Sequence, residues 1–285
     1  MKIRFIINPV SGNNKQKKIE NHISKHLENY EIFYTKKPGD ASMLSEDAVL
    51  KKIDAVVAVG GDGTVNECLK ALIHTNTALG VIPCGSGNGF AYHIGMNSNP
   101  EKSIQQLKKI KIENIDSCSI NDIPFVNVGG IGFDAHIAQL FGTLTKRGFF
   151  NYIKLILKEL SFKARKYNLK YDKINKTKKA YMISFANSSQ YGNNMKISPM
   201  ANIKDGLLDF VIVKKFPKWK IPFFLFQIAI GKVHLSKHVE IIKTKKMTII
   251  SPENLIHVDG ECYQTSNPIQ INLLEKSLKI LKPYA

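Results

Sequence analysis

Ala55-Val56-Val57-Ala58-Val59-Gly60-Gly61-Asp62-Gly63-Thr64 is the stretch that decides the fold of the first part of the chain. Its first five residues are apolar and mostly β-branched, a pattern that predicts a strand buried on both faces. The glycines that follow let the backbone approach phosphate oxygens closely, and the N–H groups at the start of the next helix would supply hydrogen-bond donors. The stretch therefore predicts an anion-binding loop after a buried strand.

Two further loops of the same kind follow predicted strands. Asn8-Pro9-Val10-Ser11-Gly12-Asn13-Asn14-Lys15 comes after Ile3–Ile7, and Pro83-Cys84-Gly85-Ser86-Gly87-Asn88-Gly89 comes after Leu79–Ile82. The carboxyl ends of parallel strands meet at one edge of a sheet, where ligands bind in such folds. None of the three loops matches the Walker A or dinucleotide-binding pattern. Together they predict one phosphate site of a different design.

The first part of the chain alternates strands and helices, which predicts an α/β domain with a mostly parallel sheet. One more strand-like stretch belongs to it, and four stretches are helix-like. The strands are Ile3–Ile7, Glu31–Tyr34, Ala55–Val59 and Leu79–Ile82, and the helices are Lys15–Asn29, Ala41–Lys52, Val65–His74 and Ser103–Lys109.

The second part has a different texture, because short strands and turns dominate it. This pattern predicts a mainly antiparallel β-sandwich domain, interrupted by one helical insertion at Phe149–Phe162. The first expected domain comprises residues 1–116 and is joined by the C-terminal segment 273–285, and the second comprises residues 117–272. The predicted strands are Ile120–Val128, Ala180–Ala186, Leu207–Val213, Lys246–Ile250, Leu255–Val258, Ile269–Asn272 and Leu278–Lys282.

Asp62 adds chemistry to the predicted anion site. A carboxylate beside a phosphate chain is electrostatically costly unless a cation or a transferring proton offsets its charge. Asp62 is therefore a candidate for a link to Mg²⁺ or for a general base. The alternative from the residues alone is that Asp62 caps the following helix.

The ordered motifs resemble the diacylglycerol kinase and sphingosine kinase catalytic-domain family over essentially the whole chain. The resemblance starts from the stretch Val56–Glu67, whose glycine loop alone is shared with NAD kinases and phosphofructokinases. The further matches make the set specific: Asn8-Pro9 with Ser11-Gly12, Thr35 with Ala41, Gly85-Ser86-Gly87-Asn88, Asn127 with Gly132-Phe133-Asp134-Ala135, Asp205-Gly206-Leu207-Leu208-Asp209, and Val258-Asp259-Gly260-Glu261.

The resemblance implies an ATP-dependent, Mg²⁺-dependent kinase of a lipid hydroxyl. Asp62, Asp116 and Glu261 match the catalytic carboxylates of the family, and either Asp62 or Glu261 is a candidate base. Residues expected to bind ATP are Asn8, Ser11, Gly12, Thr35, Gly60, Gly61, Gly63, Thr64, Gly85, Ser86, Gly87 and Asn88.

The resemblance also implies two kinds of metal position. Asp205 and Asp209 resemble a structural metal loop, whereas Asp62 would belong to the network around the ATP-linked Mg²⁺. Many diacylglycerol kinases have an aspartate where this chain has Gly89, and sphingosine kinases lack it. The acceptor therefore stays open between diacylglycerol, a sphingoid base and another lipid alcohol.

The excess positive charge is confined to one segment. Lys and Arg number 23 against 5 Asp and Glu in residues 141–250, whereas the counts are 15 against 14 in residues 1–140 and 3 against 4 in residues 251–285. Such a surface attracts polyanions. Two stretches in this segment mix aromatic residues with lysine, Phe149–Leu160 and Phe216–Phe226. They predict contact with an anionic membrane surface; the alternative is that both belong to the core or line a lipid pocket.

Four scattered cysteines in 285 residues and an N-terminal apolar run too short for a signal peptide predict a cytoplasmic protein. The basic segment with its aromatic stretches adds the expectation of peripheral association with the membrane. A homodimer stays open. No nucleic-acid-binding module is recognisable, so nucleic acid is not the expected partner. Two other functions remain as alternatives: a kinase of a soluble small molecule of the NAD kinase type, and a binder of lipid or nucleic acid without catalysis.

Overall fold

The computed structural model describes residues 1–11, 18–144, 148–159 and 161–284. The chain divides into two compact units. The first unit comprises residues 1–117 and 275–285, and the second comprises residues 118–274. The sequence predicts the boundaries between the two domains after residues 116 and 272.

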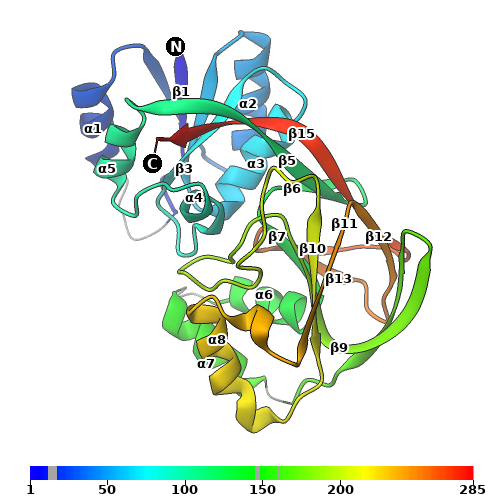
Figure 1. The fold of residues 1–285 in the computed structure, drawn as a ribbon. Helices are drawn as coiled ribbons and strands as arrows, with labels where there is room; N and C mark the ends of the chain where they lie inside the picture. Colours follow the sequence, from blue (N-terminus) through cyan, green and yellow to red (C-terminus); the bar gives the residue numbers. More distant parts are fainter. Residues whose placement is uncertain (12–17, 145–147, 160, 285) are drawn as a thin grey trace. The chain divides into compact units, whose positions relative to one another are not determined.

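The first unit contains a parallel sheet with the strand order β2-β1-β3-β4 (Figure 1). The last part of β15 (Ile269–Pro283) pairs in parallel with the outer edge of β4. All six residues of β3 are buried, because strands flank it on both sides and helices cover its faces. The predicted parallel sheet is confirmed. Its first four strands are β1 (Ile3–Ile7), β2 (Tyr30–Tyr34), β3 (Ala55–Gly60) and β4 (Ala78–Pro83).

The helices of the first unit pack in two pairs. The first pair is α2 with α3, and the second is α1 with α5. Asn99 caps α5, since its Oδ1 accepts a hydrogen bond from the N–H of Lys102 at 3.2 Å. This cap sets the start of α5 three residues before the predicted one. The helices are α1 (Ile19–His26), α2 (Asp40–Leu50), α3 (Asp62–Leu72), α4 (Gly89–His93) and α5 (Pro100–Gln106).

The second unit is built from antiparallel strand pairs, which confirms the predicted β-rich architecture. Strand β5 (Ile110–Ile120) ends in this unit, and β15 begins in it. The other strands are β6 (Ile123–Phe125), β7 (Val128–Gly132), β8 (Arg165–Tyr171), β9 (Ile174–Ala186), β10 (Leu208–Lys214), β11 (Val239–Thr244), β12 (Lys246–Ile250), β13 (Leu255–Val258) and β14 (Glu261–Gln264).

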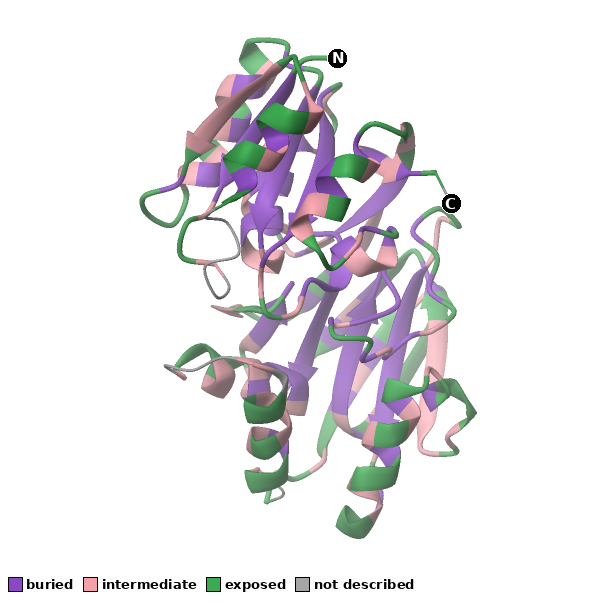
Figure 2. Ribbon diagram, turned by 90° about the vertical axis from the view of Figure 1, so that its left-hand side faces the viewer, coloured by how far each residue is buried: buried purple, intermediate pink, exposed green. Residues whose placement is uncertain are grey.

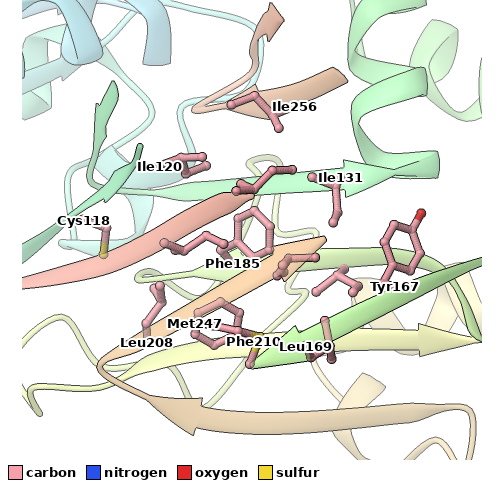
Figure 3. Packing of buried hydrophobic residues seen from close by; sticks show 14 of the residues in the cluster. Cys118, Ile120, Ile131, Tyr167, Leu169, Phe185, Leu208, Phe210, Met247 and Ile256 are labelled. Atoms are coloured by element: carbon pink, nitrogen blue, oxygen red, sulfur yellow. The ribbon is translucent and has the colours of Figure 1, made fainter. Parts of the chain in front are cut away.

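Alternate side chains of the central strands lie in two separate apolar clusters, one on each face of these strands. In β9 and β10, Phe185 and Phe210 point into the larger cluster, which Figure 3 shows together with side chains from β5, β7, β8, β12 and β13. Met182 and Val211 point to the other face. There they pack against three helices, α6 (Phe133–Gly142), α7 (Phe149–Lys158) and α8 (Ile221–Ala229). The strands are mostly buried, whereas the helices carry exposed outer sides (Figure 2).

Several predicted boundaries of the second unit are wrong. Residues 120–128 do not form one strand, because Asn121 adopts a left-handed φ of 49° and turns the chain between β5 and β6. Residues 269–272 and 278–282 belong to one continuous strand, β15. Helix α6 and strands β8, β11 and β14 were not predicted. Strand β11 pairs with the distant β10, so local patterns do not reveal it. Strands β8 and β14 pair with their neighbours β9 and β13 across two-residue turns, but their polar, partly exposed residues carry little strand signal.

Arg4 anchors the first unit from inside. Its side chain is fully buried, and its guanidinium donates hydrogen bonds to Glu31, to the carbonyl oxygen of Leu44 at 2.7 Å and to Asp47 Oδ2 at 2.8 Å. It also lies over the ring of Phe33, with 4.5 Å between Cζ and the ring centroid. One side chain therefore joins β1, β2 and α2, and its planar fork suits this multiple recognition.

We expect Arg4→Ala to lower the free energy of unfolding by about 3 kcal/mol, because it removes several charge-assisted hydrogen bonds and leaves a cavity. Lys2→Ala is the matched control. Lys2 pairs with the same Glu31 at 3.5 Å but is half-exposed, so its loss should cost less than about 1 kcal/mol. Urea denaturation followed by circular dichroism measures both. Equal effects of the two substitutions would contradict the anchoring role.

Candidate active site

The three predicted glycine loops lie at the carboxyl ends of β1, β3 and β4. The first loop is tied to the second, because the backbone N–H of Asn8 donates to the carbonyl oxygen of Val59 at 3.0 Å and Asn8 Nδ2 donates to Thr64 Oγ1 at 3.2 Å. Ser11 folds back on this loop, since its Oγ donates to the carbonyl oxygen of Asn8 at 3.1 Å. Gly12 lies outside the described residues.

The second and third loops touch through glycine backbone. A Cβ added at Gly85 would lie 2.4 Å from Gly61 Cα, a distance that no side chain tolerates. The N–H groups of Cys84 and Gly85 donate to the carbonyl oxygen of Gly60 at 2.8 and 3.1 Å. A Cβ at Gly60 would lie 2.4 Å from Thr64 Oγ1. The glycines of this motif are therefore required for the loops to meet.

Asn88 closes the third loop. Its Oδ1 accepts a hydrogen bond from the N–H of Gly85 at 2.8 Å, and its Nδ2 donates to the carbonyl oxygen of the same residue at 2.8 Å. Asn88 adopts a left-handed φ of 55°, which asparagine tolerates better than most residues. The amide is buried and does not face solvent, so its direct role is to shape the loop. Ser86, at the loop tip, is exposed.

Asp62 is the first residue of α3, and it serves the neighbouring helix. Its two carboxylate oxygens lie 3.3 Å from the backbone nitrogen of Gly89 and 3.4 Å from that of Phe90, both of which donate to it. The carboxylate thus sits at the amino end of α4, where negative charge is favourable. The alternative that Asp62 caps its own helix is wrong: the N-cap of α3 is Gly61, and no side chain caps it.

Gly89 and Phe90 are the site residues that the sequence reasoning missed as partners of Asp62. Gly89 was noted only as the place where a second carboxylate is lacking. In the structure its N–H faces the Asp62 carboxylate, so an aspartate there would bring a second negative charge close to the first. The sequence feature that points to these residues is the short spacing between Gly85 and the start of α4. It did not specify which carboxylate the new helix would meet.

Thr35 lies next to the first loop. It follows β2, is buried, and its N–H donates to the carbonyl oxygen of Ile7 at 3.0 Å. Gly63 is half-buried in the first turn of α3, and Gly87 is half-buried in the third loop. The structure thus places these predicted ATP-binding residues at the same sheet edge as Asn8 and Thr64. Their contacts with ATP stay a prediction.

Asp116 differs from Asp62 and Glu261, the other predicted catalytic carboxylates, because it is buried on β5. Its Oδ1 accepts a hydrogen bond from the N–H of Lys276 at 2.7 Å, which fastens β5 to β15 inside the first unit. This contact gives Asp116 a structural role in joining the returning C-terminal segment. Its catalytic role stays a prediction.

Glu261 belongs to the second unit and is exposed at the start of β14. The two-residue turn before it, Asp259-Gly260, has φ angles of 49° and 89° at its two residues, as a tight hairpin requires. Asp259 Oδ1 accepts hydrogen bonds from the N–H groups of Asn127 at 3.0 Å and Val128 at 3.2 Å. Asp259 therefore fixes the hairpin, while Glu261 is presented at its surface.

The pair Asp205 and Asp209 already faces a cation of the protein itself. Lys243 Nζ lies 3.1 Å from Asp209 Oδ1 and 3.8 Å from Asp205 Oδ2. Lys243 is also the cross-strand partner of Asp209, and Ser198 Oγ donates to Asp209 Oδ2 at 2.6 Å. Lys243 offsets one of the two negative charges of the pair, and the structural metal at Asp205 and Asp209 stays a prediction.

A buried polar network near β7 was not predicted. Asp134 Oδ2 accepts hydrogen bonds from Ser184 Oγ at 2.8 Å and from the Tyr191 hydroxyl at 2.6 Å, and it lies 3.0 Å from His257 Nε2. Burial, followed by the negative charge of Asp134, raises the pKa of Tyr191 well above its usual value, so this hydroxyl stays a donor. The network packs α6 onto the strands that carry the Asp-Gly-Glu hairpin. No local sequence pattern reveals it.

Within the described ranges, His, Cys, Asp and Glu side chains do not gather in any group of three or more that could hold a metal ion. This arrangement is compatible with Mg²⁺ chemistry, because Mg²⁺ is commonly held by one or two carboxylates together with the phosphates of the substrate. Asp62, beside three glycine loops, has the right chemical character for such a shared site. Among the residues that the structure describes, no helix is long and apolar enough to cross a membrane.

Comparison with known proteins gives the class to which this site belongs. Residues 2–120 match the diacylglycerol kinase catalytic domain, and residues 127–282 match the YegS C-terminal NAD kinase beta sandwich-like domain. The chain belongs to this family of lipid kinases, which are phosphotransferases with an alcohol group as acceptor. The family implies ATP as the phosphate donor.

Individual relatives agree with the family over nearly the full length. The chain is 27% identical to a diacylglycerol kinase of Mycobacterium tuberculosis, over 99% of this chain and 95% of that protein. It is 26% identical to a diacylglycerol kinase of Bacillus subtilis, over 90% and 89%. A crystal structure from Bacillus anthracis aligns with a TM-score of 0.84 at 24% identity, over 99% of this chain and 96% of that one, which confirms the fold.

We expect Gly85→Ala to weaken ATP binding by about tenfold or more, because the new methyl group would push the second and third loops apart by more than half an ångström. Gly142→Ala is the control, since a Cβ there meets open space. Titration with a fluorescent ATP analogue measures the binding, and thermal unfolding confirms that both variants fold. Unchanged binding by Gly85→Ala would show that the contact between the loops does not matter for the site.

Proposed function

We propose that this protein transfers the γ-phosphoryl group of ATP, with Mg²⁺, to a hydroxyl group of a membrane lipid such as diacylglycerol or a sphingoid base. The observation that carries the proposal is the joining of three glycine loops around Asp62 at one sheet edge. Backbone N–H groups and helix amino ends at such an edge favour a phosphate chain. The carboxylate among them favours phosphoryl transfer over simple anion binding.

The chain's own residues would act mainly by positioning. The hydroxyl oxygen of the lipid attacks the γ-phosphorus while the bond from this phosphorus to the bridging oxygen breaks, and ADP leaves. The hydroxyl proton passes to a carboxylate. Asp62 is held by two backbone N–H groups, so its orientation is fixed, as a ligand of Mg²⁺ requires. When bound, Mg²⁺ neutralises charge on the phosphates.

Glu261 is the other candidate for the proton acceptor. It is exposed directly after the Asp259-Gly260 turn, and Asp259 locks that turn by hydrogen bonds to backbone N–H groups. An exposed carboxylate on a rigid hairpin suits a group that must meet a substrate hydroxyl. We therefore assign Asp62 to the ATP and metal side of the reaction and Glu261 to the acceptor side.

A soluble acceptor is the second candidate, because the domain matched by residues 127–282 is described as NAD kinase-like. One assay separates the two. The protein is incubated with labelled ATP and Mg²⁺ and with diacylglycerol, sphingosine, total bacterial lipid or NAD⁺. We expect label in the organic phase with a lipid acceptor and none after chelation of Mg²⁺ by EDTA. Label on NAD⁺ alone, or transfer to no acceptor, would contradict the proposal.

Asp62→Asn should reduce lipid phosphorylation by about 100-fold or more, since it removes the charge of the carboxylate while keeping its shape. Asp54→Asn is the matched control, because Asp54 lies at the other end of β3 and is exposed. Initial rates and thermal unfolding are measured for both. Full activity of a folded Asp62→Asn protein refutes the assigned role, and Glu261→Gln in the same assay tests the acceptor side.

A further inference from the structure

Helix α8 is apolar at every position except Gln227. Its residues, Ile221–Ala229, include no charged side chain. Phe224 and Ile228 are buried against the face of β10 that carries Val211 and Val213. A helix of this composition is normally enclosed on all sides. This one is not, because its opposite side faces outward.

The outward side carries a stripe of large apolar residues. Trp219 is 77% exposed, Phe223 61%, Phe226 58% and Ile230 46%. Their spacing of four, three and four residues places them on one side of the helix and of the short turn before it. Leu235, in the following 3₁₀ turn Val233–Leu235, is 67% exposed and lies in a segment that contacts α8. We call these five residues the α8 face.

Lysines surround the α8 face. The stretch from Lys215 to Val239 holds five lysines and no acidic residue, whereas the preceding Lys214 pairs with Glu240 at 2.8 Å. Lys215, Lys218 and Lys232 are exposed, and Lys220 Nζ lies 5.2 Å from the centroid of the Trp219 ring. The positive field reaches His238, whose pKa is lowered by burial and then by Lys220 and Lys237. Apolar stripe and positive rim therefore occupy the same place.

We propose that the α8 face docks on an anionic lipid bilayer, with its aromatic rings at the boundary between headgroups and acyl chains and its lysines at the lipid phosphates. Trp and Phe beside Lys are the residues that bind at this depth. Helix α7 packs against the same apolar cluster and adds exposed Phe150 and Leu157 with Lys154 and Lys158. The biological purpose of the docking rests on the proposed function, but the binding itself needs no phosphoryl transfer.

Charge argues against a second copy of the chain as the occupant. In a symmetric dimer through this face, the lysine rim would meet its own copy and the like charges would repel. A nucleic acid would use the lysines but leave the apolar stripe in water. The exposure of the stripe also contradicts the alternative that the whole stretch 216–226 is core. Only a surface that is both anionic and apolar satisfies both features.

The protein has a single tryptophan, Trp219, so its own fluorescence reports on the α8 face. The full chain is mixed with vesicles of phosphatidylcholine containing phosphatidylglycerol, and with vesicles of phosphatidylcholine alone, in the absence of ATP. We expect a blue shift and quenching by brominated acyl chains with the anionic vesicles, and an effect that weakens with salt. Unchanged emission would overturn the proposal, as would a concentration-dependent dimer that masks the face.

Substitution of two exposed aromatic residues of the α8 face is the second test of the proposal. Phe223→Ser with Phe226→Ser should weaken co-sedimentation with anionic vesicles by about tenfold or more, because two aromatic side chains lose their burial. Met43→Ser with Leu50→Ser is the matched control, since both residues are exposed apolar residues on α2. Equal binding by both double variants would refute the α8 face. Transfer to a short-chain lipid acceptor in detergent micelles tests the proposed function separately.

Discussion

The contact between Gly61 and Gly85 is the constraint on which the candidate site depends. The two backbones approach so closely that neither position accepts a Cβ without movement. This approach brings the ends of β3 and β4 together, and it places the start of α4 opposite the start of α3. Asp62 then bridges the two helices through the N–H groups of Gly89 and Phe90. The result is a sheet edge where the amino ends of two helices lie around one fixed carboxylate.

Local pattern predicted the part of this arrangement that depends on neighbouring residues. The buried strand β3, its glycine loop and the parallel sheet follow from apolar periodicity and turn residues. The partner of Asp62 did not follow, because it lies 27 residues further along the chain. The same limit explains the second unit. Strand β11 pairs with the distant β10, and the turn at Asn121 is fastened by hydrogen bonds to Gln270 and Thr265. Strand β14 pairs with the neighbouring β13, but a short polar stretch such as Glu261–Gln264 carries little strand signal of its own.

The acidic residues of the predicted motifs differ in what they contact within the fold. Asp259 and Asp116 both accept backbone N–H groups and fasten segments that are distant in sequence. Asp209 is compensated by Lys243 across a strand pair. Sequence motifs group these aspartates with Asp62 and Glu261, since all five lie in conspicuous glycine-containing or acidic stretches. Hydrogen-bond partners set only Glu261 apart, because it is exposed on the hairpin that Asp259 fixes, whereas Asp62 also accepts backbone N–H groups, those of Gly89 and Phe90.

The α8 face shows the same separation for apolar residues. By composition alone, Phe223, Phe224 and Phe226 are equivalent core candidates. In the structure, Phe224 is buried against β10, whereas Phe223 and Phe226 are more than half exposed. Keeping aromatic side chains in water is unfavourable by the full cost of hydrating their surface, and lysine neighbours do not reduce that cost. This cost is removed only when a lipid bilayer covers the aromatic side chains, and the positive rim indicates that the bilayer is anionic.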